Sequence, residues 1–152
     1  MFEESTLIEK RTTNKLCSYW SSIRGNRNYP NKLDIDFDDI EEIKEYCFIL
    51  SIKEVGNKME YKFDYIGSTL HEIFEQEQHQ VLSINYSIIS LNPESALESI
   101  DEVMESGYPV INETQTIVDD GNELSFRQCF LPLSDNNKDI NSILGTFRCK
   151  IS

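Results

Sequence analysis

Apolar and polar residues alternate along two separate parts of the chain, and this pattern limits the possible folds more than any other feature. A period of two is typical of a β-strand with one buried face. In the first part, two such runs flank Gly56-Asn57, which predicts a β-hairpin with strands over 48–52 and 59–65. In the second part, strands are predicted over 110–118, 123–133 and 143–149. Together these runs predict one antiparallel sheet.

The segments outside these runs have helical periodicity. Leu16, Tyr19, Trp20 and Ile23 follow a spacing of three and four residues, which predicts a helix over 5–24. A helix over 93–106 is predicted because Pro93 suits a first helical position and Gly107 suits a left-handed end. Short helices are predicted over 39–45, capped by Asp38, and over 70–74, capped by Thr69.

The order of these elements predicts an α+β fold in a single domain, with helices packed on one face of the sheet and an additional N-terminal helix. A length of 152 residues is ordinary for one domain, and 39% hydrophobic residues can build a core. We expect residues 1–30 to form the helical extension with its turn, and residues 31–152 to form the core domain.

The charge of the chain excludes some classes of partner. It carries 27 acidic against 14 basic residues, a net charge of −13, and has no Lys or Arg between Lys62 and Arg127. Such a chain repels phosphate backbones and anionic lipids, so we expect neither nucleic acid nor a membrane as partner. The acidic surface either keeps the protein in solution or binds a basic partner, which includes the basic N-terminal part of a second copy. With no apolar run long enough to span a membrane, the chain is predicted to be cytoplasmic.

The sequence contains no recognisable catalytic or metal-binding motif. It has no glycine-rich phosphate loop and no zinc-protease motif, so we predict a protein that is not an enzyme and that binds no metal. The four cysteines, Cys17, Cys47, Cys129 and Cys149, have no close spacing, which indicates free thiols in a reducing compartment. A redox pair formed by the fold stays open as an alternative.

Several local motifs occur in the same order as the predicted elements. They are Leu16, Tyr19-Trp20, Ile23-Arg24-Gly25, Arg27, Pro30 and Leu33-Asp34-Ile35-Asp36; Tyr61, Phe63 and Tyr65-Ile66-Gly67-Ser68-Thr69-Leu70; and Leu131-Pro132-Leu133 with Ile143-Leu144-Gly145. With this order, the chain resembles the PAS sensory domains, and more closely the short stand-alone PAS proteins of alphaproteobacteria, over roughly residues 10–149.

The resemblance implies a five-stranded antiparallel sheet around a small cavity, and a role in sensing or relaying a signal without chemistry of its own. It does not fix a ligand, and we expect no cofactor. PAS domains with flavin photochemistry use a cysteine in an Asn-Cys-Arg motif, which none of the four cysteines has. A haem-type PAS domain needs an axial histidine. His71 is the candidate for that alternative, and otherwise it is a residue at the edge of its helix.

The cavity candidates are the residues of the strand rows that would face inward. They are Phe48, Leu50, Phe63, Tyr65, Phe126, Gln128 and Phe130. A buried Gln or Tyr needs a hydrogen-bond partner, which either the protein or a ligand supplies. Because alternate residues point oppositely, the sequence does not decide whether Gln128 or its neighbours face the cavity.

The N-terminal helix supplies the candidate partner interface, namely Leu16, Trp20, Ile23 and Arg24. Trp20 either packs on the sheet or forms the centre of a homodimer contact. Arg24 and Arg27 either pair with nearby aspartates such as Asp34 or bind an anionic ligand or a partner carboxylate. We therefore predict a sensory module that acts in trans on a kinase or another regulator, as a homodimer, with a small ligand as its gate. The alternative is a protein that binds a metabolite or haem.

Overall fold

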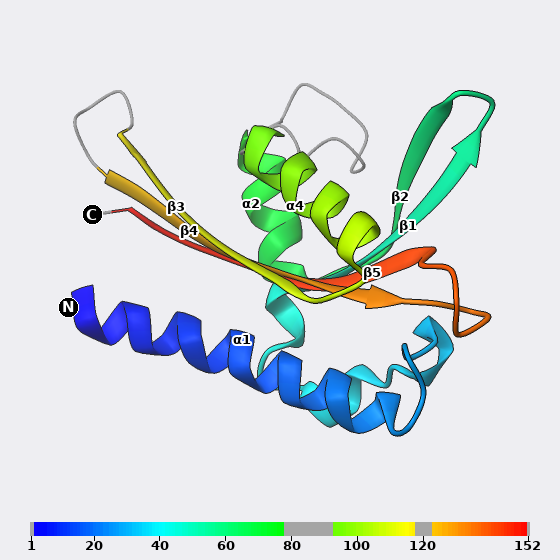
Figure 1. The fold of residues 1–152 in the computed structure, drawn as a ribbon. Helices are drawn as coiled ribbons and strands as arrows, with labels where there is room; N and C mark the ends of the chain where they lie inside the picture. The colour runs from blue at the N-terminus through cyan, green and yellow to red at the C-terminus, as the bar shows by residue number, and fades with distance from the viewer. Residues whose placement is uncertain (1, 78–92, 118–122, 152) are drawn as a thin grey trace.

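The computed structural model describes residues 2–77, 93–117 and 123–151, with side chains for 11–72, 97–113, 125 and 127–148. Five strands form one antiparallel sheet in the order β2-β1-β5-β4-β3 (Figure 1). The strands are β1 (Cys47–Val55), β2 (Lys58–Ile66), β3 (Val110–Ile117), β4 (Glu123–Leu133) and β5 (Ser142–Ile151). The predicted five-stranded antiparallel sheet is confirmed, and the hairpin turn lies at Gly56, whose φ is +65°.

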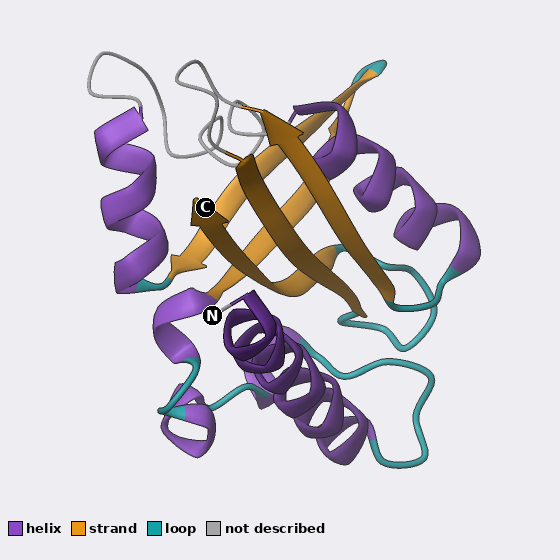
Figure 2. Ribbon diagram, turned by 90° about the vertical axis from the view of Figure 1, so that its left-hand side faces the viewer, coloured by secondary structure: helices purple, strands orange, loops and turns teal. Residues whose placement is uncertain are grey.

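Helices cover both faces of this sheet. Helix α1 (Phe2–Arg24) lies on one face, and helices α2 (Ser68–Glu77) and α4 (Pro93–Ser106) lie on the other (Figures 1 and 2). Helix α4 ends before Gly107 at a φ of +75°, as its sequence predicts. The α+β class with an N-terminal helix is thus confirmed, and α1 closes the face that α2 and α4 leave open.

The two faces have separate hydrophobic cores. On the α4 side, the core consists of Phe48, Leu50, Ile52, Leu70, Ile100, Val103, Phe130, Ile143 and Phe147. On the α1 side, it consists of Leu16, Trp20, Ile40, Ile43, Cys47, Ile49, Cys129, Leu131, Leu133 and Leu144. Adjacent residues of β1, β4 and β5 therefore belong to different cores, which explains why these strands are apolar at consecutive positions.

A β-bulge separates two aromatic residues that the alternation places on one face. Ile49 pairs with Tyr65 and Leu50 pairs with Phe63, so β2 has one extra residue here. Phe63 packs against the α4-side core, whereas Tyr65 packs against the α1-side core and stacks on Phe37 with ring centroids 3.9 Å apart. The expectation that Tyr65 shares the face of Phe63 is wrong.

The predicted helix over 39–45 is also wrong. Short 3₁₀ turns occupy Lys32–Asp34, Phe37–Ile40 and Lys44–Tyr46 instead. The cap is Asp36, whose carboxylate accepts a hydrogen bond from the Asp38 backbone N–H at 3.0 Å. Ile40 and Ile43 are both buried against the α1-side core at a spacing of three, the period of a 3₁₀ turn.

Helix α2 begins at Ser68, and Thr69 does not cap it. The Thr69 hydroxyl donates instead to the Glu45 carboxylate at 2.6 Å, which ties the helix start to the preceding 3₁₀ turn. Gly67 sits directly against this turn, where a Cβ atom would overlap the backbone carbonyls of Lys44 and Glu45. A side chain at position 67 would therefore displace the start of α2.

Candidate functional site

Strand β4 presents alternate residues to the two cores. Phe130 packs against the α4-side core, while Cys129 and Leu131 lie under α1. Because Gln128 is two residues before Phe130, it faces the same side as Phe130. The structure thus decides the question that the sequence leaves open, and it places Gln128 on the side of the cavity candidates.

Gln128 is a buried polar residue on this face. Its side chain is 2% exposed, and neither its amide oxygen nor its amide nitrogen has a hydrogen-bond partner among the residues that the structure describes. Its cross-strand neighbour Asn112 donates to the hydroxyl of Ser99 on α4 at 3.1 Å. Buried amides without partners are rare in folded proteins, since each lost hydrogen bond costs free energy.

Two aromatic rings pack against Phe48 on the face of the sheet that also carries Gln128. The Phe48 ring meets Phe63 and Phe130 edge to face, with centroids 5.8 and 6.0 Å away. Phe48, Leu50 and Phe130 are buried in one core, and Phe63 packs against it. The structure therefore brings these candidates together, whereas the side chain of Phe126 lies outside the described residues.

Leu16 and Trp20 are buried within the chain, so they are not available to a partner. Leu16 is 0% exposed and Trp20 is 5% exposed. The indole N–H of Trp20 donates to the backbone carbonyl of Pro132 at 2.8 Å. Of the two interpretations of Trp20, packing on the sheet is confirmed. The interface prediction fails for these two residues because the apolar stripe of α1 already covers the sheet.

The two arginines after this stripe have different roles. Arg27 pairs with Asp34 at 2.7 Å and donates to the carbonyl of Ile23 at 2.6 Å, so it closes the end of α1. The guanidinium of Arg24 lies over the Trp20 ring, 5.0 Å from its centroid, and its Nε has no hydrogen-bond partner among the described residues. The predicted pairing with Asp34 is therefore confirmed for Arg27 alone.

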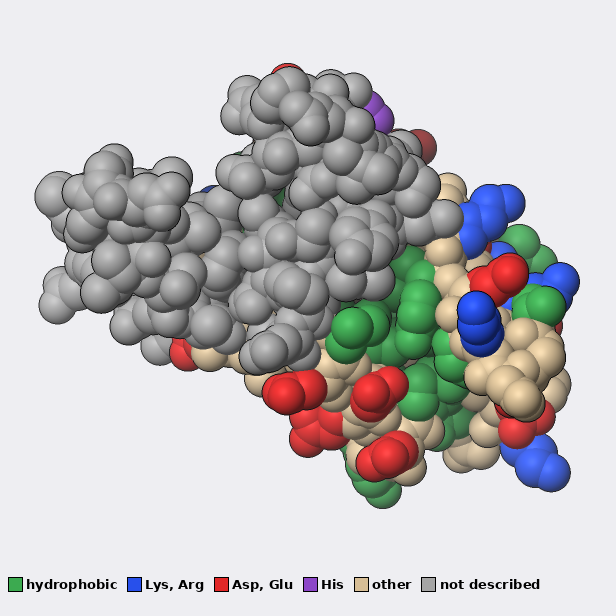
Figure 3. All heavy atoms as spheres, turned by 90° about the horizontal axis from the view of Figure 1, so that it is seen from above, with side chains coloured by type: hydrophobic (Ala, Val, Ile, Leu, Met, Phe, Trp, Pro, Cys, Tyr) green, Lys and Arg blue, Asp and Glu red, His purple; other side chains and the backbone are tan. Residues whose placement is uncertain are grey.

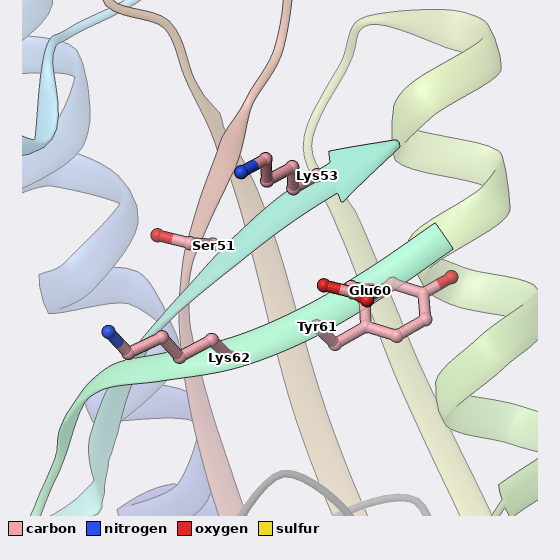
Figure 4. A pocket seen from close by; sticks show the side chains of 5 residues that line it. All are labelled: Ser51, Lys53, Glu60, Tyr61 and Lys62. Atoms are coloured by element: carbon pink, nitrogen blue, oxygen red, sulfur yellow. The ribbon is translucent and has the colours of Figure 1, made fainter. Parts of the chain in front are cut away.

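Two surface pockets are lined by described residues. A pocket of about 570 Å³ on the β1–β2 hairpin is lined by Ser51, Lys53, Glu60, Tyr61 and Lys62 (Figure 4). Tyr61 points toward α4 and the lysines point away from it (Figure 4). Burial, together with the negative charge of Asp101, raises the pKa of the Tyr61 phenol. Apart from Tyr61, the residues of this pocket belong to no recognisable motif, so the sequence does not mark the site.

A smaller pocket of about 280 Å³ lies where the ends of α1 and α4 meet. It is lined by Trp20, Arg24, Arg27, Asn28, Tyr29, Ser106, Gly107, Tyr108 and Pro109. Its walls come from segments that are far apart in the sequence, which is why no local motif predicts it.

Comparison with known proteins decides the family. A family model described as a PAS domain matches residues 8–148, which is most of the chain. The chain belongs to the PAS domain family. No curated protein matches it.

Solved structures similar to this PAS domain are distant in sequence. One, published as "Flavin Analogue Sheds Light on Light-Oxygen-Voltage Domain Mechanism", has 14% identity and a TM-score of 0.52, and the match covers 79% of this chain and 88% of that chain. A PAS domain from Colwellia psychrerythraea has 11% identity and a TM-score of 0.45, with 74% and 94% covered. The periplasmic sensory domain of the Campylobacter jejuni chemoreceptor Tlp1 has 13% identity and a TM-score of 0.32, with 96% and 53% covered. The first of these shows a shared fold.

The cysteines of this PAS domain that the structure describes lie on the α1 side. Cys47 and Cys129 belong to the α1-side core, and Cys17 packs against it. They are therefore separated by the sheet from Gln128 and Phe48. Any ligand held beside Gln128 would meet amide and aromatic groups, and no thiol from these three residues.

His71 lies on α2, next to the buried Leu70, and is itself half-buried. Within the described ranges, no group of three or more His, Cys, Asp or Glu side chains could hold a metal ion. None of the described helices is long and apolar enough to cross a membrane.

Proposed function

We propose that this PAS domain is a non-catalytic sensory module of the cytoplasm that acts in trans on a kinase or another regulator, and that a small ligand beside Gln128 gates it. The observation that carries the proposal is the unpartnered, 2% exposed amide of Gln128. A ligand with both a donor and an acceptor would satisfy the two amide groups, and the Phe48 and Phe130 rings would contact its apolar part.

The position of Gln128 on β4 supports a route from ligand to helix α1. Its neighbour Cys129 lies on the opposite side of the sheet, under α1, together with Leu131. Two new hydrogen bonds to Gln128 would bias the position of β4, and the packing of α1 would follow. The ligand then favours one of two arrangements of α1 in proportion to its difference in affinity for them.

The outer face of α1 is the surface through which we expect a partner to detect this change. Its exposed side chains are polar or charged and include Arg11, Asn14, Lys15, Ser18, Ser21 and Ser22. Ile23 and Arg24 stay half-buried at the helix end, and they are the part of the predicted homodimer interface that a second copy could contact.

Charge gives a second argument about partners. Seen from the α4 side, acidic side chains gather over α4 and lysines gather on the β1–β2 hairpin (Figure 3). The exposed acids of α4 are Glu98, Asp101, Glu102 and Glu105. A partner that approaches α4 would therefore need basic residues, and nucleic acid would be repelled.

Native mass spectrometry of the purified protein tests the ligand. We expect an added mass that dissociates on denaturation and that is absent from a Gln128→Met variant. The matched control is Ser51→Ala, which alters the hairpin pocket and leaves Gln128 intact. Loss of the added mass in Ser51→Ala, with its retention in Gln128→Met, would move the ligand to the hairpin and refute this site.

The alternative function, simple binding of a metabolite, rests on the same amide and differs in its effect on α1. Hydrogen exchange of the backbone amides in residues 11–24 separates the two. A sensor should change protection there by several-fold when the ligand is removed, because α1 is its output. Equal protection with and without the ligand would favour storage or transport of the ligand over signalling.

A further inference from the structure

Two thiols that are far apart in the sequence meet between α1 and the sheet. The Sγ atoms of Cys17 on α1 and Cys129 on β4 are 3.8 Å apart, within hydrogen-bond distance for sulfur. Cys129 is 0% exposed, whereas Cys17 is half-buried and thus reachable from solvent. The pair links α1, which we propose as the output element, to the strand that carries Gln128.

The surroundings favour ionisation of Cys17 over that of Cys129. The hydrogen bond from Cys129 and the positive charge of Arg127 lower the pKa of Cys17 to about 7, against the opposing effect of burial. The same hydrogen bond and burial raise the pKa of Cys129. Arg127 is held in place by Thr13 at 3.3 Å and Glu113 at 2.5 Å. One thiol of the pair is therefore accessible and nucleophilic, and the other is shielded beside it.

Cys47, in the same core, has the properties of an unreactive thiol. Its thiol donates to the backbone carbonyl of Ile43 at 3.3 Å, and burial raises its pKa to about 12. It shares the α1-side core with Cys129 but lacks an exposed partner thiol within the described residues. The contrast makes Cys47 the internal control for any claim about Cys17.

We propose that Cys17 and Cys129 form an oxidation site for hydrogen peroxide, at which an intramolecular disulfide fixes α1 to β4. The Cys17 thiolate attacks one peroxide oxygen, the O–O bond breaks, and the released hydroxide takes up a proton to leave as water. Cys17 is then a sulfenic acid. The Cys129 sulfur attacks the Cys17 sulfur, the S–O bond breaks, and the Cys129 proton leaves with the hydroxyl as a second water. Each sulfur loses one electron, and the peroxide oxygens gain the two.

For the second step the two sulfurs must close from 3.8 Å to about 2 Å. Because Cys129 is shielded, it meets oxidant only through Cys17, so the disulfide is favoured over separate oxidation. The proposal does not depend on a ligand at Gln128. Its consequence for signalling is that α1 cannot leave the sheet while the disulfide persists.

Peptide mapping of the full chain after treatment with hydrogen peroxide tests the proposal. Trypsin releases Cys17 in residues 16–24 and Cys129 in residues 128–138, so the disulfide joins two identifiable peptides. We expect this joined pair to appear, to lack two hydrogen atoms, and to separate on reduction. The number of free thiols should fall from four to two. This measurement uses the unaltered protein and does not depend on the folding of a variant.

Cysteine variants then show which thiol is oxidised first and which one completes the disulfide. Cys17→Ser should abolish the disulfide, and Cys129→Ser should leave Cys17 as a sulfenic or sulfinic acid. Cys47→Ser and Cys149→Ser should both retain the joined peptides. Oxidation of Cys17 in the unaltered protein without any joined peptide would overturn the proposal, as would a disulfide that pairs either residue with Cys47 or Cys149.

Discussion

Replacement of Gln128 by methionine is the sharpest test of the interpretation of the buried amide. Both side chains are unbranched and of similar size, so the substitution keeps the packing against Phe130 and removes the polar groups. The amide of Gln128 has two groups without partners among the described residues. Each buried group of this kind costs about 1–3 kcal/mol.

The expected result is that the ligand-free protein becomes more stable. Local relaxation of the amide reduces the summed cost, and we expect a gain of about 2 kcal/mol in the free energy of unfolding. For a chain of this length, that corresponds to a rise in Tm of roughly 4–8 °C. Thermal and urea unfolding of protein that has been refolded from denaturant, and is thereby free of ligand, give the measurement.

The control is a buried-face amide that has a partner. Asn112 donates to Ser99, so Asn112→Leu should lower the stability by about 1–3 kcal/mol, opposite in sign to Gln128→Met. If Gln128→Met lowers the stability of ligand-free protein by a similar amount, the protein itself satisfies the amide and the reasoning fails.

Three further predictions follow from single contacts. Trp20→Phe should cost about 1–3 kcal/mol in urea unfolding, since the carbonyl of Pro132 loses its donor, and an unchanged midpoint would contradict this. Gly145→Ala should cost about 1–3 kcal/mol or more, because the added Cβ overlaps the Phe48 ring and the Cys129 carbonyl; wild-type stability would show that the sheet accommodates it. Alkylation of Cys17 by iodoacetamide should accelerate as the pH rises through about 7, because the thiolate is the form that reacts. Cys129→Ala should move the midpoint of this pH dependence to higher pH, because it removes the hydrogen bond that lowers the pKa of Cys17 most. An unmoved midpoint would refute that cause.

The features that the sequence predicts correctly are the ones with local causes. The hairpin follows from alternation around Gly56, and the end of α4 follows from Gly107; both glycines have positive φ values. The family resemblance adds that the strands form one five-stranded antiparallel sheet, which the structure confirms, and the family match over residues 8–148 confirms the family. The strand pattern makes Gln128 a candidate, but only the structure shows that its amide is buried without a partner among the described residues.

The features that the sequence could not supply depend on pairing between distant segments. The bulge that turns Tyr65 away from Phe63 is a property of two strands together, and no residue in β2 marks it. Leu16 and Trp20 are buried because α1 packs on the sheet of its own chain. The same apolar stripe would also be expected of a helix that forms a dimer contact, so the sequence does not separate the two cases. Cys17 and Cys129 are 112 residues apart, so the sequence leaves their proximity open and offers no argument for it.

The junction beside the end of α4 has a consequence for how the two helical layers move. A Cβ atom at Gly107 would lie 2.6 Å from the Tyr29 hydroxyl, so this glycine is in close contact with the segment that follows α1. The backbone N–H of Tyr29 in turn donates to the Asn137 side chain in the β4–β5 turn at 3.1 Å. The end of α4, the segment after α1 and the β4–β5 turn are thus connected by contacts at one edge of the sheet. A tilt of α4 about these contacts would displace the segment after α1 directly, and through Tyr29 it would also act on the β4–β5 turn.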